Sequence, residues 1–532
     1  MGKDIDILIK GGKVYDGTGE DPYVADIGVS GGRIAFISND LSSYGTRASD
    51  VIDAAGLSVA PGFIDAHSHS EFTLLADGRA EGKILQGITT EINGNCGLSA
   101  APLFGEAKEH REGDLRELGI KERWSTFSDY FGLLEKKRPA LNFATLVGHG
   151  NIRGSVIGYE DRKPGMEEME KMRSLARDAV SEGAIGLSTG LIYPPGVYAD
   201  TEELVGLAKS IRERIYTSHM RSEGDGLIEA IEETVRIGKE SGIHVHISHL
   251  KTGGRANWGK IESAISVIES SRRSGIEVTC DRYPYIAAAT DLDAVLPSWT
   301  YAGGVEEELR RLGDPNVRSV LRSEFLSQGR TDDYWAGITI SSLQSDSNKW
   351  MEGKSLLDAS REAKKGPVDF LFDVLLEEKL RIGAIFHSMN EDNLIRFLSL
   401  PYLMIGSDSS ARSMDGPTRQ GKPHPRTFGT FPRFLGRYAR DKGLMGLSKA
   451  VHKTTFLTAK TFGLRERGCI KPDFWADLVI FDESRIMDQA TFEDPFQQPE
   501  GVRHVIVNGQ PVVRHGVLTG ARGAGKVLRH GG

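Results

Sequence analysis

The chain has 532 residues and a formal net charge of -8 at pH 7. This length predicts one large domain together with a smaller one. The acidic balance argues against a nucleic-acid partner and against binding to an anionic membrane surface. The sequence has no run of about 18 apolar residues that could span a bilayer and no signal-peptide core at its start. The three cysteines are widely spaced, so we expect no disulfide framework and a cytoplasmic location.

Short strands separated by turns are predicted at both ends of the chain. They are apolar or alternate between apolar and polar residues, and they lie at 5–9, 25–29, 34–37, 51–52, 476–481 and 502–509. Neither end has enough strands to bury a face by itself. We therefore expect residues 1–60 and 465–532 to form one small β-sandwich domain.

Between the two ends, apolar strands recur at intervals long enough for a helix, which is the pattern of parallel βα units. Eight strand ends are predicted, at 63–65, 89–92, 144–147, 184–187, 215–217, 245–247, 277–279 and 403–406. Eight such units predict a (β/α)8 barrel over residues 61–464, with its active site at the carboxyl ends of the strands. About 120 residues separate the last two strand ends, so we expect an insertion at about 284–380 that covers the barrel mouth.

Side chains that can bind a metal follow several of these strands. His67 and His69 follow the first strand, and residues two apart on an extended chain point the same way. The others are Cys96 after the second strand, His219 after the fifth, His249 after the sixth and Asp408 after the eighth. Each residue alone is more often a surface or core residue, but together at one face they predict a metal site. Imidazole and thiolate suit Zn²⁺, which needs one open position for water in a catalytic site.

Other motifs carry less weight. Four further histidines have no role that their position demands: His149, His244, His246 and His387. His246 is out of alternation with His249, so we expect its side chain to face the helices. The segment 186–190 matches the nucleophile elbow of serine hydrolases, but two prolines soon after it prevent the helix that an elbow requires. The segment 520–526 resembles a Walker loop without its hydroxyl residue, so no phosphate site is predicted there.

Longer stretches resemble a known family. The motif FIDAHSH at 63–69, after an N-terminal β unit, resembles the amidohydrolase superfamily. INGNCG, YTSHMRSEGD, HISHLK, DRYPY, HSMNEDN, MIGSDSS and HPRTFGTFPRFL resemble its N-acyl-D-amino-acid deacylase branch, and the resemblance spans nearly the whole chain. Most amidohydrolases with two metals bridge them by a carboxylated lysine after the fourth strand, where this chain has Ser188-Thr189-Gly190. The deacylase branch uses a cysteine after the second strand instead, which Cys96 matches.

The resemblance implies roles for the metal-competent residues. Cys96, His219 and His249 would hold one zinc tightly. His67, His69 and Asp408 would frame a weaker second position around the same thiolate. Asp408 would also take the proton from water and deliver it to the departing amine, and its alternative role is a helix N-cap.

Three further residues are candidates for binding the carboxylate of the substrate. Lys251 and Tyr283 match the groups that the family uses for it, and Tyr193 lies after the fourth strand. Their alternative roles are a solvated lysine and packing aromatics. One departure from the family pattern is Asp473, which stands where a glycine is usual and affects only a turn of the terminal β unit.

The resemblance therefore implies zinc-dependent hydrolysis of small N-acyl-D-amino acids to a carboxylate and a free D-amino acid. The preference for the D form comes from the resemblance alone. A cyclic-amide hydrolase of the dihydropyrimidinase or hydantoinase kind stays open as an alternative, although it would use the bridging lysine that this chain lacks. A non-catalytic protein on the same scaffold is a third possibility, against which the complete set of six metal-competent residues argues.

Overall fold

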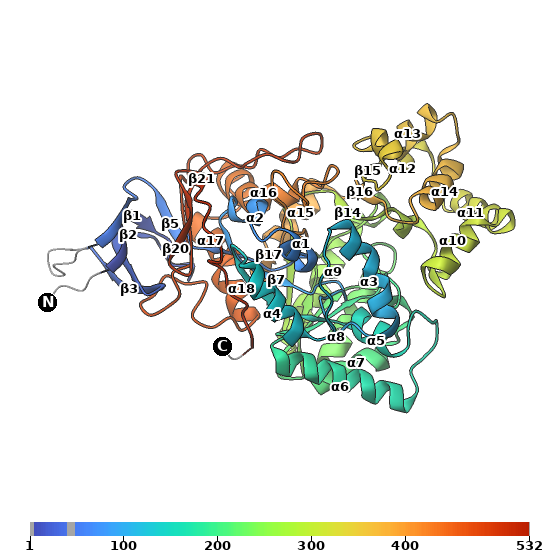
Figure 1. The fold of residues 1–532 in the computed structure, drawn as a ribbon, viewed down its shortest axis with the longest axis horizontal. Helices are drawn as coiled ribbons and strands as arrows, with labels where there is room; N and C mark the ends of the chain where they lie inside the picture. The colour runs from blue at the N-terminus through green and yellow to red at the C-terminus, as the bar shows by residue number, and fades with distance from the viewer. Residues whose placement is uncertain (1–4, 40–47, 531–532) are drawn as a thin grey trace.

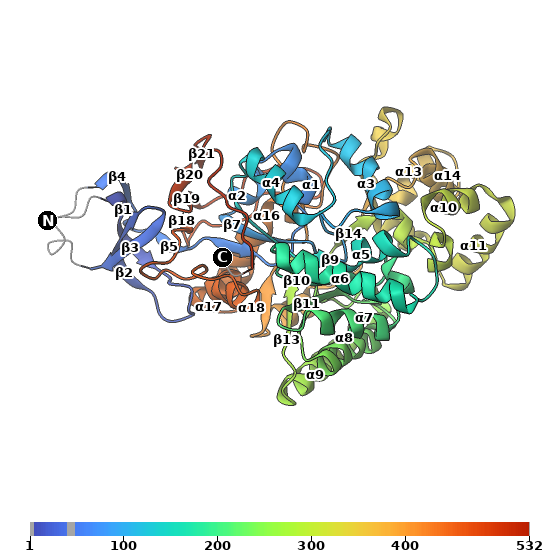
Figure 2. The ribbon, with the colours of Figure 1, turned by 60° about the horizontal axis from the view of Figure 1, so that its bottom comes forward.

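The computed structural model describes residues 5–39 and 48–530, so parts of the predicted terminal domain, at 1–4, 40–47 and 531–532, lie outside the described residues. The described chain has a mixed α/β structure in an elongated molecule (Figures 1 and 2). A sheet built from both ends of the chain lies at one end of the molecule. Parallel strands with their helices occupy the middle, and a largely helical insertion lies at the other end.

The terminal sheet has nine strands within the described residues. They are β1 (Ile5–Val14), β2 (Tyr23–Ser30), β3 (Arg33–Ser38), β4 (Ala48–Asp53), β5 (Ser58–Pro61), β18 (Leu478–Phe481), β19 (Val502–Val507), β20 (Gln510–Arg514) and β21 (Val517–Leu518). The two chain ends join where β5 pairs antiparallel with β18, so that Pro61 lies opposite Leu478. Apolar residues from both ends, such as Ile27 and Ile480, bury one another in a shared cluster.

Parallel strands form the middle of the molecule in two hydrogen-bonded groups. One group contains β6 (Phe63–Asp65), β7 (Ile88–Asn93) and β8 (Asn142–Thr145). The other contains β9 (Val147–Gly148), β10 (Gly186–Gly190), β11 (Ile215–His219), β12 (His244–Ile247), β13 (Val278–Arg282) and β17 (Leu403–Ile405). Strands therefore lie at all eight places where the apolar pattern predicts them. The predicted metal-binding residues lie at or just beyond the carboxyl ends of these strands.

Helices connect the parallel strands. α6 (Met166–Glu182), α7 (Thr201–Ser210), α8 (Leu227–Ser241) and α9 (Ile261–Arg273) precede β10, β11, β12 and β13 and pack side by side (Figure 2). The shorter helices of the first half are α1 (Glu71–Ala76), α2 (Glu81–Ile84), α3 (Gly105–Glu117), α4 (Phe127–Lys137) and α5 (His149–Val156). α8 buries Leu227 and Ile231 on one face and is capped by Gly242, whose φ of 73° is left-handed.

The insertion between β13 and β17 has a sheet and a core of its own. The sheet is antiparallel, in the order β14 (Ala288–Asp291), β16 (Gly383–Phe386), β15 (Ile338–Ser342). Its helices are α10 (Val305–Gly313), α11 (Pro315–Ser327), α12 (Asp332–Ala336), α13 (Leu356–Glu362) and α14 (Pro367–Glu377). Trp335, Phe325 and Phe372 lie in its buried cluster. Because β16 pairs with β14, this unit extends to Phe386, slightly beyond the predicted end.

The chain then returns to the terminal sheet. It passes through α15 (Glu391–Leu398), β17, α16 (Arg426–Arg433), a π-helical segment (Phe434–Asp441), α17 (Leu447–Thr454) and α18 (Phe456–Thr461). Within residues 5–39 and 48–530, every helix is too short or too polar to cross a bilayer.

Candidate metal centre

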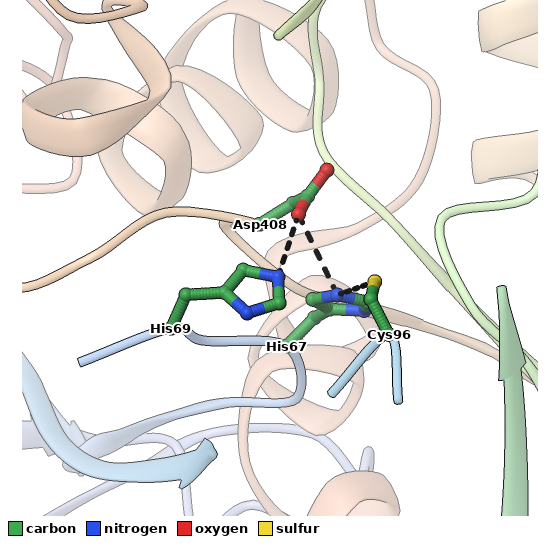
Figure 3. A group of neighbouring side chains, drawn as sticks. All are labelled: His67, His69, Cys96 and Asp408. Carbon is green, nitrogen blue, oxygen red and sulfur yellow. Dashed lines mark hydrogen bonds and ion pairs between the residues drawn. The ribbon is translucent and has the colours of Figure 1, made fainter. Parts of the chain in front are cut away.

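The six metal-competent side chains come together beyond the carboxyl ends of the parallel strands. They form two groups, in each of which one ligand atom per residue lies within 4.8 Å of the others. We call the first the carboxylate group; it contains His67, His69, Cys96 and Asp408 (Figure 3). We call the second the imidazole group; it contains Cys96, His219 and His249. Cys96 is the member that the two groups share.

Short contacts surround the Cys96 thiol. Its Sγ atom is 3.3 Å from Nε2 of His67 and 3.4 Å from Nε2 of His249. On the other side of the carboxylate group, Oδ1 of Asp408 is 3.2 Å from Nε2 of His69 and 3.5 Å from Nε2 of His67 (Figure 3). Strand ends that are far apart in the sequence thus deliver donor atoms to one point.

The ring nitrogens of His219 indicate that the centre binds a ligand. It is buried, and neither ring nitrogen hydrogen-bonds to any residue in the described ranges. Its ring packs edge to face on that of His249, with centroids 4.4 Å apart. A buried polar atom without a partner costs about 1–3 kcal/mol, and a metal ion would use the free lone pair. Thiolate, imidazole and carboxylate form a donor set that Zn²⁺ favours, so the residues present fit a metal.

Three members of the two groups have a left-handed backbone. The φ angles are 52° at Cys96, 36° at His249 and 50° at Asp408. A residue with a Cβ atom pays roughly 1–3 kcal/mol for this conformation. All three residues lie just past the ends of their strands, β7, β12 and β17, where the chain must turn sharply. Strain of this kind persists only where the surrounding structure enforces it, and it is concentrated at functional sites.

Charge keeps two of the donors in their anionic forms. Burial by itself raises the pKa of the Cys96 thiol, but the neighbouring His67 and His249 outweigh it and hold this pKa well below its usual range. Burial likewise raises the pKa of Asp408, and the guanidinium of Arg426, 2.9 Å from Oδ2, together with His67 lowers it well below its usual range. A thiolate and a carboxylate are the forms that bind metals.

Asp281, the buried carboxylate on β13, orients two of the histidines from behind. Its Oδ2 is 3.2 Å from Nδ1 of His67, and its Oδ1 accepts a 3.0 Å hydrogen bond from the backbone N–H of His249. Occupying Nδ1 of His67 leaves Nε2 directed at Cys96. Our sequence analysis missed Asp281, although an acidic residue at the end of the seventh strand obeys the rule that singled out Asp408.

The prediction that His246 faces the helices is wrong. Its buried ring places Nε2 2.8 Å from Oδ2 of Asp281 and Nδ1 2.9 Å from Oγ1 of Thr279. The alternation on which the prediction rested ends at Ile247, where β12 ends. Since His249 has a left-handed φ, the parity of two residues cannot be counted across this turn.

Lys251, a predicted carboxylate-binding residue, lies next to the imidazole group. Its Nζ atom is 2.9 Å from Nδ1 of His249 and forms a short ion pair with Glu223. Oε1 of Glu223 is itself 2.9 Å from Nδ1 of His249. Burial raises the pKa of Glu223, but Lys251 and His249 hold it well below its usual range. Glu223, which the sequence analysis also missed, therefore gives Lys251 a carboxylate partner within the protein.

The two predicted tyrosines contact different neighbours of the centre. The hydroxyl of Tyr283 is buried and has no hydrogen-bond partner among the described residues, and its ring lies 4.3 Å from Arg282 and 4.5 Å from Arg426. The ring of Tyr193 packs edge to face on His219, with centroids 5.0 Å apart. Its hydroxyl is 2.8 Å from Oγ1 of Thr290 on β14, which connects the centre to the insertion.

Two other patterns in the sequence have structural roles. Ser188, in the elbow-like segment, is fully buried on β10, and its hydroxyl accepts a 3.1 Å hydrogen bond from the N–H of Gly97. It is not followed by a helix, so it is not placed as a nucleophile. His149 is buried with its Nε2 2.7 Å from Glu203, which accounts for it without a role in the centre.

Comparison with known proteins assigns the chain to a family. The sequence model of the amidohydrolase family matches residues 50–265 and 408–513. The chain belongs to the amidohydrolase family. This amidohydrolase is 38% identical to the D-aminoacylase of Alcaligenes xylosoxydans xylosoxydans, over 98% of this chain and 97% of the relative. It is 35% identical to the N-acyl-D-glutamate deacylase of the same organism, over 96% and 94%. The resemblance to the N-acyl-D-amino-acid deacylase branch is therefore confirmed.

Solved structures of this branch share the fold. A crystal structure of D-aminoacylase matches the amidohydrolase with a TM-score of 0.82 at 37% identity, over 99% of this chain and 100% of the other. The N-acyl-D-glutamate deacylase of Bordetella bronchiseptica, solved with zinc and a phosphonate that mimics the tetrahedral intermediate, matches with a TM-score of 0.84 at 34% identity, over the same shares. A dihydropyrimidinase of Brevibacillus agri matches with a TM-score of 0.55 at 17% identity, over 98% of each chain, which shows the fold alone.

Proposed function

We propose that this amidohydrolase hydrolyses the amide bond of N-acyl-D-amino acids and releases a carboxylate and a free D-amino acid. The observation that carries the proposal is the shared position of Cys96, which joins the carboxylate group to the imidazole group. Three relatives that align with nearly the whole chain support it, since their names describe the deacylation of N-acyl-D-amino acids. The preference for the D form rests on these relatives.

Zinc is the metal that we propose for the centre. Cys96, His219 and His249 would hold one ion tightly, as the resemblance to the deacylase branch implies, and they combine a thiolate with two imidazoles. His67, His69 and Asp408 would frame a second, weaker position around the same thiolate. When bound, zinc would lower the pKa of a water molecule and polarise the amide carbonyl.

The protein's own residues would move the proton and hold the substrate. Asp408 would accept a proton from the attacking water at Oδ1 and deliver it to the leaving nitrogen, while Arg426 holds Oδ2. Lys251 and Tyr283 would bind the substrate carboxylate, with Tyr193 as a third candidate beside His219. Lys251 is already paired with Glu223, so the substrate carboxylate would share its ammonium with that side chain. The buried, unpaired hydroxyl of Tyr283 is free to donate.

We also propose that the two groups of parallel strands close into one (β/α)8 barrel over residues 61–464. Backbone hydrogen bonds across both gaps support closure: Ala66 N–H donates to the carbonyl of Ile405 at 3.2 Å, and Ile185 N–H donates to that of Thr145 at 2.8 Å. The insertion would cover the mouth of this barrel. Residues 1–60 and 465–532 would form the small sandwich domain, and the cytoplasmic location stays a prediction from the sequence.

The two alternatives have less support. A cyclic-amide hydrolase shares the fold at 17% identity, but residues 188–190 at the end of β10 contain no lysine to bridge two metals. A non-catalytic scaffold would not need to keep six metal-competent side chains together, three of them on a strained backbone.

A substrate panel tests the proposal. Purified protein would be assayed with N-acetyl D- and L-amino acids carrying apolar or acidic side chains, and with hydantoin in parallel. We expect cleavage of D substrates, loss of activity after a chelator, and recovery when zinc is added back. Protein dialysed without chelator is the matched control. Cleavage of hydantoin without cleavage of any N-acyl amino acid would contradict the proposal.

A further inference from the structure

A second polar cluster lies behind the carboxylate group and is buried. Its centre is Lys83 on α2, whose side chain has no exposed surface. Five oxygen atoms surround its Nζ atom: Oδ2 of Asp65 at 2.7 Å, Oγ of Ser68 at 2.8 Å, Oε1 of Glu91 at 2.8 Å, Oγ of Ser407 at 2.8 Å and the carbonyl of Ser409 at 3.0 Å. The proposed reaction makes no use of this lysine.

The Lys83 cluster and the carboxylate group lie on two sides of the same two chain segments. In the segment 67–69, His67 and His69 belong to the carboxylate group, whereas Ser68 between them bonds to Lys83. This is the alternation of an extended chain. In the segment 407–409, Asp408 belongs to the carboxylate group, whereas its neighbours on either side bond to Lys83. The ammonium of Lys83 therefore hydrogen-bonds to both segments on the side away from the carboxylate group.

Asp65 reinforces the connection between the two segments. Its Oδ1 accepts hydrogen bonds from the backbone N–H of Ser407 at 2.7 Å and of His67 at 3.2 Å. Its Oδ2 accepts a 2.6 Å hydrogen bond from the hydroxyl of Ser407 in addition to that from Lys83. The left-handed φ of Asp408 thus sits next to a residue that is held at two atoms, which provides the external constraint that such a backbone requires.

Lys83 stays charged in this position. Burial by itself lowers the pKa of a lysine, but Asp65 and Glu91 outweigh it and raise the pKa of Lys83. Another buried lysine, Lys453 on α17, offers a contrast. It donates to a single backbone carbonyl, that of Leu400, and burial lowers its pKa to about 8. A cation with two carboxylates and three further oxygens fixes the geometry of its surroundings far more strongly.

We propose that Lys83 is a positioning residue, whose ammonium sets the separation between the His67–His69 segment and the Asp408 segment. This inference rests on the proposed function, since it assigns the carboxylate group its place in catalysis. Without the ammonium, the two segments lose their common partner and Asp408 shifts relative to the histidines. A displacement of about 1 Å at a reacting group can cost about 100-fold in rate.

The variant Lys83→Met tests the inference, with Lys453→Met as its matched control. Both changes remove a buried ammonium and keep a side chain of similar length. We expect Lys83→Met to lower kcat by about 100-fold and to change KM by less than about 3-fold. In cobalt-substituted protein, the thiolate-to-cobalt absorption of the imidazole group should persist. Lys453→Met should keep the kcat of the folded protein, whatever its melting temperature. Equal losses of kcat in the two variants would overturn the inference.

A double variant separates positioning from charge balance. Lys83→Met leaves Asp65 and Glu91 facing each other without a cation, and this alone can unfold the protein. Lys83→Met combined with Glu91→Gln removes one of the two charges. We expect the melting temperature of the double variant to recover while kcat stays low. Recovery of both would mean that Lys83 only balances charge, which would overturn the proposed role.

The outcome can be told apart from a failure of the proposed function. If the wild-type protein cleaved no N-acyl-D-amino acid, the proposed function would be contradicted. The positioning role of Lys83 would then be tested by structure rather than by kinetics. Crystal structures of the wild type and of the double variant would then be compared. We expect the distance between Nε2 of His69 and Oδ1 of Asp408, 3.2 Å in the wild type, to change in the variant. An unchanged arrangement of the carboxylate group would overturn the inference.

Discussion

Asp408 and Arg426 form an ion pair at the edge of the carboxylate group, with Oδ2 of the carboxylate 2.9 Å from the guanidinium. Arg426 is buried and begins α16, so it reaches Asp408 from a different element. The pair occupies one carboxylate oxygen and leaves Oδ1 directed at His67 and His69. The residue proposed to carry the proton is thus held at one atom and available at the other.

Replacing Arg426 should therefore impair catalysis. We expect Arg426→Met to lower kcat/KM by about 10- to 100-fold, because Asp408 would lose the buried cation that pairs with its Oδ2, and a displacement of about 1 Å at a reacting group can cost about 100-fold in rate. Steady-state kinetics with an N-acetyl-D-amino acid would measure the loss. Arg437→Met is the control, since Arg437 is half-exposed and pairs loosely with Glu391 at 3.6 Å. A variant at Arg426 that performs like this control would exclude a role for the ion pair.

Asp281 should influence the centre without touching the substrate. Asp281→Asn removes the negative charge that orients His67, while the amide oxygen can still accept from the backbone N–H of His249. We expect metal affinity or kcat to fall by about 10- to 100-fold, the usual effect of losing an outer hydrogen-bond partner of a ligand. Metal titration and kinetics would measure it. Asp477→Asn, which alters a buried ion pair with Arg467 in the terminal sheet, controls for burial, and an equal effect there would argue against the orienting role.

Cys96 is the one residue whose loss should affect both groups. We expect Cys96→Ser to lower the zinc content to a small fraction of one ion per chain and to abolish activity, because a hydroxyl does not ionise to replace a thiolate. Metal analysis after gel filtration would measure the content. Cys469→Ser is the matched control, since Cys469 is also buried but lies outside both groups. Normal zinc content in Cys96→Ser would remove Cys96 from the centre.

The insertion should lose stability as the pH rises. Glu308 on α10 is 4% exposed, its Oε1 has no hydrogen-bond partner among the described residues, and burial with a contribution from Asp293 raises its pKa to about 8. In the unfolded chain its pKa is about 4.3. Between these values the folded state binds a proton that the unfolded state does not, so stability falls as pH rises, by up to about 1.4 kcal/mol per pH unit.

Glu308→Gln should reduce this pH dependence, and Asp293, whose pKa burial raises to about 7, would account for part of what is left. We expect the variant to melt at the wild-type temperature near pH 4 and several degrees above the wild type at pH 8.5. Thermal unfolding followed by calorimetry at both pH values would measure it. Glu306→Gln, at an exposed position on the same helix, should leave the pH profile unchanged. If Glu308→Gln kept the wild-type slope, the carboxyl of Glu308 would not be the source.

The sequence predicts the parts of the structure that depend on local pattern. Alternating and apolar runs mark the strands, and the strand ends mark His67, His69 and Cys96, because a metal ligand must follow a parallel strand to reach the common face. The same rule predicts Asp281, which lies at the end of the seventh strand and was not among the predicted residues. The alternation of side chains fails as a guide at His246, because a left-handed turn at His249 interrupts the count of alternating residues.

The amino-acid sequence by itself determined the kinds of donor atoms, their order along the strands and the family to which they belong, since these depend on residue type and spacing. Only the tertiary structure decided which charges meet. Arg426 faces Asp408, Glu223 occupies Lys251, and Lys83 joins the backs of two ligand segments. Each of these contacts is made between elements whose separation in space is set by packing, and no local pattern along the chain encodes that distance.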